Sequence, residues 1–262
     1  MRGGALGLDA GLDVQGLPQS GTGQTALLTG LNAPARVGAH LGPFPTAALR
    51  DLLATHGLPS VARTAGLRVA FANAYPDAVL ARVALGRGRL DAIGRAMALA
   101  GVRLRGQDDL RRGAALSASL TGHGWREHLG IDVPIWSEAE AGARLVALAA
   151  QYDLTAFAHY ATDAAGHRAT RAGAVQTLAR YDAFLAGVLA ALPDGMIVVL
   201  ASDHGNIEDI SHGRHTRNPA LAAWHGAAVP DRWAATTDVA PAILAALGVA
   251  APGAVDGRPA MG

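Results

Sequence analysis

Short apolar segments alternate with helical patterns in the second half of the chain, and this alternation constrains the fold more than any other sequence feature. Residues 196–200 are wholly apolar, which is typical of a parallel strand covered on both faces. Residues 154–158 form another strand pattern, and Ser137 with Glu140 makes a capping box that begins a helix extending to Ala150. The pattern predicts a doubly wound α/β fold, with a mostly parallel sheet covered by helices on both faces. Ligands bind such sheets at the carboxyl ends of the strands.

The remaining segments fit the same order of elements. We expect a short helix after the turn at residues 17–24, strands at residues 68–74 and 221–224, and helices at residues 164–192 and 237–247. The first fifteen residues show no sustained periodicity, and the segment 76–135 is rich in arginine and glycine without a long apolar strand. We therefore predict a discontinuous α/β core at residues 1–75 and 136–262, with residues 76–135 inserted as a cap that contacts the substrate.

The composition excludes several classes of protein. The formal net charge is +1, because 22 Lys and Arg residues balance 21 Asp and Glu residues, so the chain is not a polybasic nucleic-acid-binding protein. It has no cysteine, which excludes a disulfide scaffold, a zinc-thiolate site and a thiol nucleophile. No window has the ~18 consecutive apolar residues that a membrane span needs. We expect a cytoplasmic protein that binds neither nucleic acid nor a membrane, and any metal must be held by histidine, carboxylate or hydroxyl groups.

Two pairs of acidic and histidine residues follow predicted strands. Asp163 and His167 come after the strand at residues 154–158, and their spacing lets both side chains converge on one ion. An aspartate at this position can equally be a simple helix N-cap. Asp203 and His204 directly follow the strand at residues 196–200 and precede a glycine, an arrangement that suits one ion or an ordinary polar turn.

Histidines are concentrated from the second pair onward. Four of the 10 histidines lie in this part of the chain: His204, His212, His215 and His225. A single histidine is usually a surface or core residue, but this density beside two Asp/His pairs indicates a metal site. Neutral imidazole with carboxylate favours Zn, Mn or Fe over Ca.

Ser20 begins a predicted helix within the sequence Pro-Gln-Ser-Gly-Thr-Gly-Gln. The free N–H groups and the positive end of the dipole make a helix N-terminus an anion site, and glycines let a phosphate approach. A hydroxyl that binds a metal ion loses its proton more easily and becomes a nucleophile. The alternative is that Ser20 only caps the helix.

Taken in order, the motifs Asp-x-x-x-His, Asp-His-Gly-Asn-x-Glu and His-Thr-x-Asn-Pro, over residues 17–247 with Ser20, resemble the alkaline phosphatase superfamily of two-metal enzymes. Within it, they are most similar to the branch of cofactor-independent phosphoglycerate mutase and phosphopentomutase. The resemblance implies one divalent ion, Mn or Zn, on Asp163, His167 and His215, and a second on Asp203 and His204 beside the nucleophile Ser20. It implies a phosphatase or phosphomutase that acts on a small phosphate ester through a phosphoserine. We also expect Thr22, Gly23, Arg217 and Asn218 to contact the substrate.

The sequence departs from this superfamily in two places. Gly23 is followed by Gln24 where the relatives have Gly-His, which affects how substrate is held. The superfamily also begins with an apolar strand that ends in Asp-Gly and supplies a further ligand to the metal beside the nucleophile, and no such strand precedes residue 17. Asp9 and Asp13 lie too close to Ser20 to take that role. We therefore expect that the first strand is missing from this chain and that its natural N-terminus lies upstream.

We consider three alternative functions. A dinucleotide-binding fingerprint needs a strand before the glycines and an acid ~20 residues after them, and neither is found around Gly21 and Gly23. A metal-independent serine hydrolase would use Ser20, but Pro18 and Thr22 break the Gly-x-Ser-x-Gly pattern. The third is a catalytically impaired metal-binding relative, because of the missing ligand.

Overall fold

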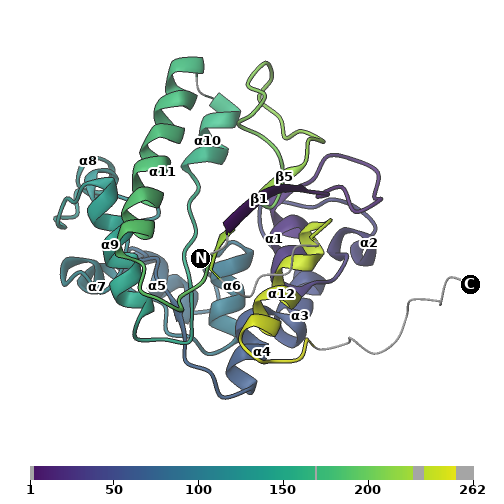
Figure 1. The fold of residues 1–262 in the computed structure, drawn as a ribbon, viewed down its shortest axis with the longest axis horizontal. Helices are drawn as coiled ribbons and strands as arrows, with labels where there is room; N and C mark the ends of the chain where they lie inside the picture. The colour runs from purple at the N-terminus through teal and green to yellow at the C-terminus, as the bar shows by residue number, and fades with distance from the viewer. Residues whose placement is uncertain (1–2, 169, 227–232, 252–262) are drawn as a thin grey trace, which may run out of the picture.

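The computed structural model describes residues 3–168, 170–226 and 233–251 (Figure 1). The strands are β1 (Gly3–Leu8), β2 (Val69–Phe71), β3 (Leu154–Ala156), β4 (Val198–Ala201) and β5 (Ala220–His225). The first eight helices are α1 (Ser20–Thr29), α2 (Ala33–Val37), α3 (Ala47–His56), α4 (Leu58–Thr64), α5 (Asp77–Ala84), α6 (Ala92–Leu99), α7 (Gln107–Arg111) and α8 (His123–Leu129). They are followed by α9 (Glu138–Ala149), α10 (Ala161–Arg168), α11 (Arg171–Ala191), the 3₁₀ turn η1 (Thr236–Asp238) and α12 (Val239–Ala246).

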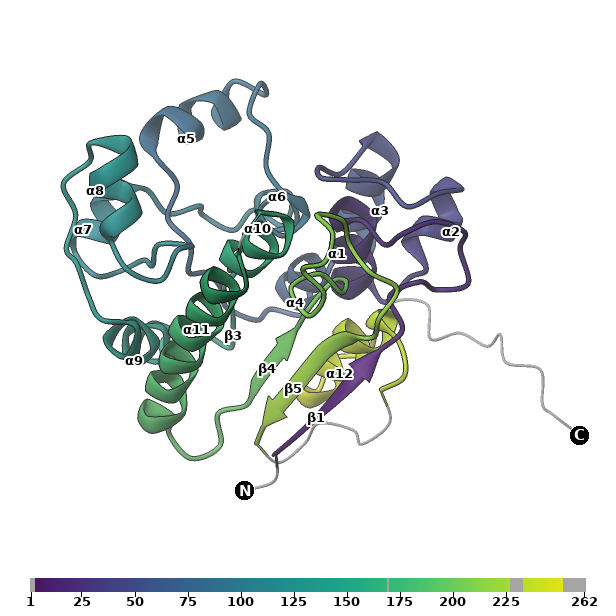
Figure 2. The ribbon, with the colours of Figure 1, turned by 90° about the horizontal axis from the view of Figure 1, so that it is seen from above.

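The described strands form two sheets (Figure 2). In the first sheet, β5 lies between β1 and β4 and pairs with both in antiparallel orientation. In the second sheet, β2 and β3 pair in parallel. The predicted α/β class is confirmed, but these strands do not form one mostly parallel sheet. The chain returns from β4 to β5 without a crossover helix, and parallel neighbours would need such a crossover.

β1 lies before Ser20, so the expectation that no strand precedes residue 17 is wrong, and sequence periodicity does not predict this strand. Three of its six residues are glycine, so it lacks the apolar alternation of an ordinary strand. A Cβ at Gly4 would lie 2.6 Å from the Trp224 ring, and a Cβ at Gly7 would lie 2.5 Å from the Cβ of Pro219. The glycines therefore make room for side chains in and directly before β5, and this packing rather than local propensity determines the strand.

The helical prediction for residues 164–192 corresponds to two helices. α10 ends at Arg168, and α11 begins after Thr170, whose hydroxyl caps the new helix by accepting the N–H of Gly173 at 3.2 Å. The expected capping box at Ser137 and Glu140 is confirmed at the start of α9. The hydroxyl groups therefore mark where these helices begin, as capping preferences predict.

Residues 76–135 contain α5 to α8 and pack in two ways. α6 packs against α1 and α3 and is continuous with the core. Trp125 of α8 packs in a separate apolar cluster with Leu110, Val133 and Trp136. The proposed division into core and cap stays a prediction.

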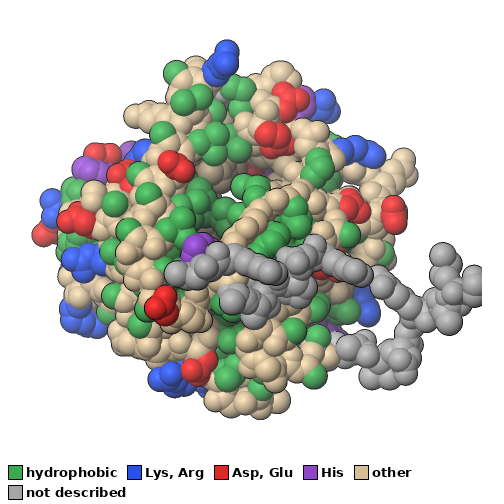
Figure 3. Space-filling model, viewed as in Figure 1, with side chains coloured by type: hydrophobic (Ala, Val, Ile, Leu, Met, Phe, Trp, Pro, Cys, Tyr) green, Lys and Arg blue, Asp and Glu red, His purple; other side chains and the backbone are tan. Residues whose placement is uncertain are grey.

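β4 packs against apolar clusters on both of its faces, although all four of its residues are only half-buried. Val198 packs against the cluster that contains Phe184, whereas Val199 and Ala201 pack against the cluster that contains Ala220 and Ala222 of β5. Figure 3 shows hydrophobic side chains gathered in a hollow near the centre of one face of the molecule. No helix in the described ranges is long and apolar enough to cross a membrane.

Candidate metal centre

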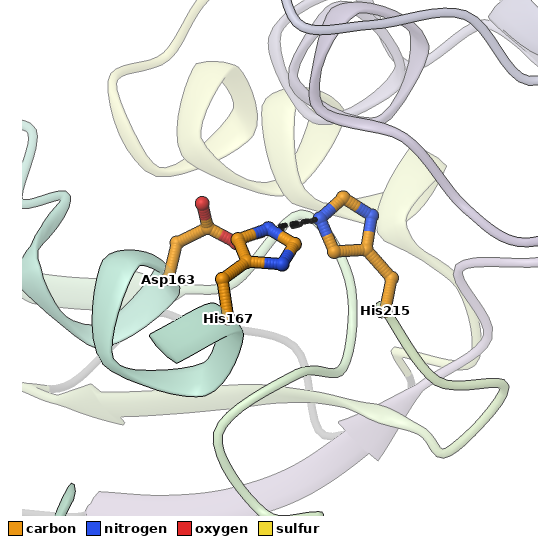
Figure 4. Close-up of side chains that lie close together, drawn as sticks. All are labelled: Asp163, His167 and His215. Carbon is orange, nitrogen blue, oxygen red and sulfur yellow. Dashed lines mark hydrogen bonds and ion pairs between the residues drawn. The ribbon is translucent and has the colours of Figure 1, made fainter. Parts of the chain in front are cut away.

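Three separate segments bring the first set of candidate ligands together. Asp163 and His167 lie one turn apart on α10, so their side chains share one face of the helix. His215 comes from the loop that joins β4 to β5. Figure 4 shows the three side chains pointing toward one another. The chain therefore collects at one point three residues that are distant in sequence, as their motifs predicted.

The three donor atoms form a compact triangle. His215 Nε2 lies 3.1 Å from His167 Nε2, and Asp163 Oδ1 lies 3.4 Å from His167 Nε2 and 3.5 Å from His215 Nε2. Tetrahedral ligands at the usual zinc distances are separated by about 3.3 Å. The donor set therefore fits a divalent ion without rearrangement.

Backbone carbonyl groups orient both imidazoles. His167 Nδ1 lies 3.0 Å from the carbonyl oxygen of Gly213, and His215 Nδ1 lies 2.7 Å from that of Pro18. Each Nδ1–H can donate to its carbonyl, which leaves Nε2 unprotonated and directed at the metal position. The carbonyl of Pro18 also links this set to the segment that contains Ser20.

The environment of Asp163 favours its ionised form. Burial alone would raise the pKa of this carboxyl, but contacts with His215, His204, Asn206 and His167 outweigh burial and lower it. Asn206 Nδ2 donates to Asp163 Oδ1 at 2.6 Å. A carboxylate that stays charged is a competent ligand at neutral pH.

The second candidate set centres on one nitrogen of His204. Ser20 Oγ lies 3.1 Å from His204 Nε2, and Asp203 Oδ2 lies 3.5 Å from the same nitrogen. His204 Nδ1 instead faces the carbonyl oxygen of Gly205, at 3.3 Å. Three donor atoms therefore converge on a common region, as they do around an ion.

The two sets are neighbours. The rings of His204 and His215 are stacked, with centroids 3.7 Å apart. Burial raises the pKa of Asp203 although the charge of His204 opposes it, and burial lowers the pKa of His204. The His204 imidazole is therefore held in the neutral form that metal binding needs.

The start of α1 lies directly against the second set. A Cβ at Gly23 would lie 2.7 Å from the carbonyl oxygen of Asp203, so glycine is required for this approach. Burial has the largest effect on the pKa of the Asp203 carboxyl and raises it, while the Gln24 side chain has a smaller effect that lowers it. The start of α1 and the backbone of Asp203 are therefore in direct contact.

Among the hydroxyl groups at the start of α1, Ser20 is the accessible one. Ser20 is half-buried, whereas Thr22 and Thr25 have no exposed surface. Thr22 Oγ1 donates to backbone carbonyls, one of them that of Leu41 at 3.3 Å, and Thr25 Oγ1 donates to Gly21 at 2.7 Å. The expected nucleophile is therefore the hydroxyl of this segment that a substrate can reach.

The other expected substrate contacts lie in different surroundings. Thr22 and Gly23 are buried in α1, while Arg217 and Asn218 are exposed in the loop before β5. Asn218 Nδ2 donates to Glu208 Oε1 at 3.1 Å. Their contact with substrate stays a prediction.

Glu208 is a structural residue of the site that the candidate set did not include. It accepts the backbone N–H of Asn206 at 2.6 Å and is hydrogen-bonded by the side chains of Thr216 and Asn218. These bonds join two parts of the loop between β4 and β5, the part that follows Asp203 and the part that carries His215. The Asp-His-Gly-Asn-x-Glu motif contained this signal, because it includes both Asn206 and Glu208.

Residues 134–248 match the model of the family described as the Metalloenzyme superfamily. The match covers 115 of the 262 residues, less than half of the chain. The matched segment contains all five candidate metal ligands, and the description of the family supports divalent metal binding; Ser20 lies outside the matched residues. The match confirms the superfamily resemblance that the three downstream motifs indicated.

Seventeen chains of solved structures are similar to this chain, two of which are described here, and no curated protein matches it. The PH0037 protein from Pyrococcus horikoshii is 14% identical, with a TM-score of 0.47, and the similarity covers 71% of this chain and 51% of that one. Leishmania mexicana phosphoglycerate mutase, determined at low cobalt concentration, is 15% identical with a TM-score of 0.47. Here the similarity covers 77% of this chain and 38% of the mutase. The chain thus spans about half or less of each of these proteins.

Proposed function

We propose that the chain is a metal-dependent phosphoryl-transfer enzyme in which Ser20 accepts the phosphoryl group of a small phosphate ester. One ion is held by Asp163, His167 and His215, and a second by Asp203 and His204 next to Ser20. The observation that carries the proposal is the adjacency of the two donor sets, with the accessible hydroxyl of Ser20 3.1 Å from His204 Nε2.

The residues of the chain have separable roles in this reaction. Divalent ions, Mn or Zn, would neutralise the phosphate oxygens and lower the pKa of a nearby hydroxyl. Ser20 Oγ forms a bond to phosphorus while the bond from phosphorus to the ester oxygen breaks. The ester oxygen leaves with the electron pair and takes up a proton, and the serine proton is released to solvent. The positive end of the α1 dipole stabilises charge on the phosphoryl oxygens.

The second half of the reaction decides between a phosphatase and a phosphomutase. Water that takes the phosphoryl group from Ser20 gives hydrolysis, whereas an oxygen of a second substrate molecule gives a mutase. Arg217 is the exposed cation of the His-Thr-x-Asn-Pro motif, and we assign it, with Asn218, to the substrate.

A metal-independent serine hydrolase accounts less well for the geometry. In a Ser-His-Asp triad the serine and the aspartate bind opposite nitrogens of the imidazole. Here Ser20 and Asp203 lie near the same nitrogen of His204, and the other nitrogen faces a backbone carbonyl. Convergence on one nitrogen favours ion binding over a proton relay.

Mass spectrometry after incubation with Mn²⁺ and an aryl phosphate tests the proposal. We expect phosphate on Ser20 in the wild-type chain and none in Ser20→Ala. Ser60→Ala is the matched control, because Ser60 lies on α4 and bonds only to the carbonyl of Leu53. Phosphate on Thr22 or Thr25 would contradict the assignment, and a chain that binds metal without forming phosphoserine would be the impaired relative.

A further inference from the structure

The N-terminal ends of two helices from distant parts of the chain are joined beside the metal centre. Tyr160 directly precedes α10, and its carbonyl accepts the N–H of Ala164 at 3.1 Å. Asp91 is the N-cap of α6, and its Oδ1 accepts the N–H of Gly94 at 3.1 Å. The free oxygen of this carboxyl, Oδ2, accepts the Tyr160 hydroxyl at 2.5 Å.

This hydrogen bond connects the two sides of the proposed active site. On one side, α10 carries Asp163 and His167. On the other side, α6 packs against α1, which begins at Ser20.

A second tyrosine in the same cluster makes no such connection. The Tyr75 hydroxyl is buried beside Asp91, and among the described residues it makes no hydrogen bond to α10. It lies above Gly94, where a Cβ would overlap it and would also lie 2.8 Å from Asp91 Oδ1. The carboxyl of Asp91 is thus closely packed on this side, and its partner on α10 is Tyr160.

We propose that Asp91 and Tyr160 are positioning residues that hold the N-terminal end of α10 in place for metal binding. The farther end of α10 is already fixed, because His167 Nδ1 faces the carbonyl of Gly213. With both ends held, Asp163 reaches the ion position without further ordering of the helix. The inference rests on the proposed function in one respect: α10 must carry metal ligands.

Tyr160→Phe tests the proposal, with Tyr75→Phe as the matched control. Both variants remove one hydroxyl near Asp91, but only the first removes the hydrogen bond that joins α10 to α6. In the metal-free chain we expect faster amide hydrogen exchange in residues 161–168 for Tyr160→Phe alone. In a Mn²⁺ titration we expect about 10-fold weaker binding for Tyr160→Phe, as is typical when a partner outside the ligand set is lost. Tyr75→Phe should match the wild type in both measurements, since its hydroxyl does not join α10 to α6.

An Asp91→Ala background shows whether the two residues act as one unit. In that background Tyr160→Phe should cause no further change in exchange or in Mn²⁺ affinity, because the bond is already absent. Equal behaviour of Tyr160→Phe and Tyr75→Phe, or independent effects of the Asp91 and Tyr160 changes, would overturn the proposal. Amide hydrogen exchange that becomes faster in Tyr160→Phe equally in α9 and in α10 would also overturn the proposal.

Failure of the proposed function gives a different result. The exchange measurement needs neither metal nor substrate, so it tests the connection by itself. Faster exchange in α10 with no phosphate on Ser20 would contradict phosphoryl transfer alone. Phosphate on Ser20 with unchanged exchange in Tyr160→Phe would contradict the positioning role alone, and a wild-type chain that binds no Mn²⁺ would overturn both.

Discussion

His215 is the residue at which the two candidate donor sets meet. Its Nε2 completes the triangle with Asp163 and His167, and its ring stacks on that of His204. Burial alone would lower the pKa of His215, but its contacts with Asp163 and with the Pro18 carbonyl raise it overall. A single side chain therefore supplies a donor to one ion position and packs against His204, a candidate ligand of the other.

Replacing His215 with alanine should lower the bound metal by about one equivalent, because only two donors of the triangle remain. His212→Ala is the control, since its imidazole is 38% exposed and its Nε2 lies 3.7 Å from Asp209 Oδ2, in a contact separate from the triangle. Metal analysis of the two purified variants makes the comparison. Equal metal content in His215→Ala and His212→Ala would refute the ligand assignment.

His159 links the pH of the solution to stability at a single residue. Burial lowers the pKa of this imidazole, and the charge of Arg180 acts in the same direction, against the hydrogen bond to the Ala118 carbonyl. The ring stacks on Tyr181 with centroids 4.8 Å apart. In the folded chain the side chain is therefore held neutral in a mostly apolar environment.

The free energy of unfolding should fall as the pH drops below about 6.5, because the unfolded chain then binds a proton that folded His159 resists. This loss is complete once the pH passes below the folded pKa. His159→Phe keeps the stack on Tyr181 but removes the titration, so its unfolding free energy should depend less on pH, by up to about 1.4 kcal/mol per pH unit. Urea unfolding of both chains with a chelator, from pH 7.5 to 5, measures the difference. Parallel curves for the two chains would show that His159 does not contribute.

At the scale of elements, α9 and α11 approach each other through a pair of glycines. A Cβ at Gly142 of α9 would lie 2.6 Å from the backbone nitrogen of Val188. A Cβ at Gly187 of α11 would lie 2.6 Å from the Cα of Ala139 and would overlap its carbonyl oxygen. The backbones are in contact there, and α11 continues from the helix that carries Asp163.

Gly187→Ala should therefore destabilise the chain by about 1 to 3 kcal/mol, the usual cost of overpacking, although alanine is the better helix former. Gly124→Ala in α8 is the opposite case, because its Cβ would meet nothing closer than 3.5 Å, from Ser119 Oγ. That change should stabilise the chain by up to about 1 kcal/mol. Thermal unfolding of both variants gives the two signs, and a stabilised Gly187→Ala would show that the helices separate without cost.

The elements also show how far sequence reasoning reaches. Residues 196–200 and the Ser137 capping box contain local signals, and both predict elements that the structure confirms in type. β1 has no local signal, because its glycines are selected by side chains of β5 that are distant in sequence. In the candidate site, the side-chain ligands can be predicted from motifs. The backbone carbonyls of Pro18 and Gly213, which face the imidazoles, cannot be predicted in this way, because every residue type has a carbonyl.

For the whole molecule, the two donor sets differ in what they offer an ion. Among the described residues, Asp163, His167 and His215 form the one cluster of three His or acidic side chains with converging donor atoms. The other set has Asp203 and His204, with the neutral hydroxyl of Ser20 as its third donor. A neutral hydroxyl is a poorer ligand than an imidazole until an ion is already held.

We therefore expect Mn²⁺ to bind in two unequal steps, the first at the triangle and the second, weaker step beside Ser20. Ligand binding raises the free energy of unfolding by about 2.7 kcal/mol when free metal is 100 times its dissociation constant. The unfolding temperature should therefore rise in two separate ranges of Mn²⁺ concentration. His215→Ala should remove the first rise, and Ser20→Ala should weaken the second while leaving the first unchanged. Because each variant targets one set, loss of the first rise in Ser20→Ala, or two steps of equal affinity in the wild type, would contradict this division of the site.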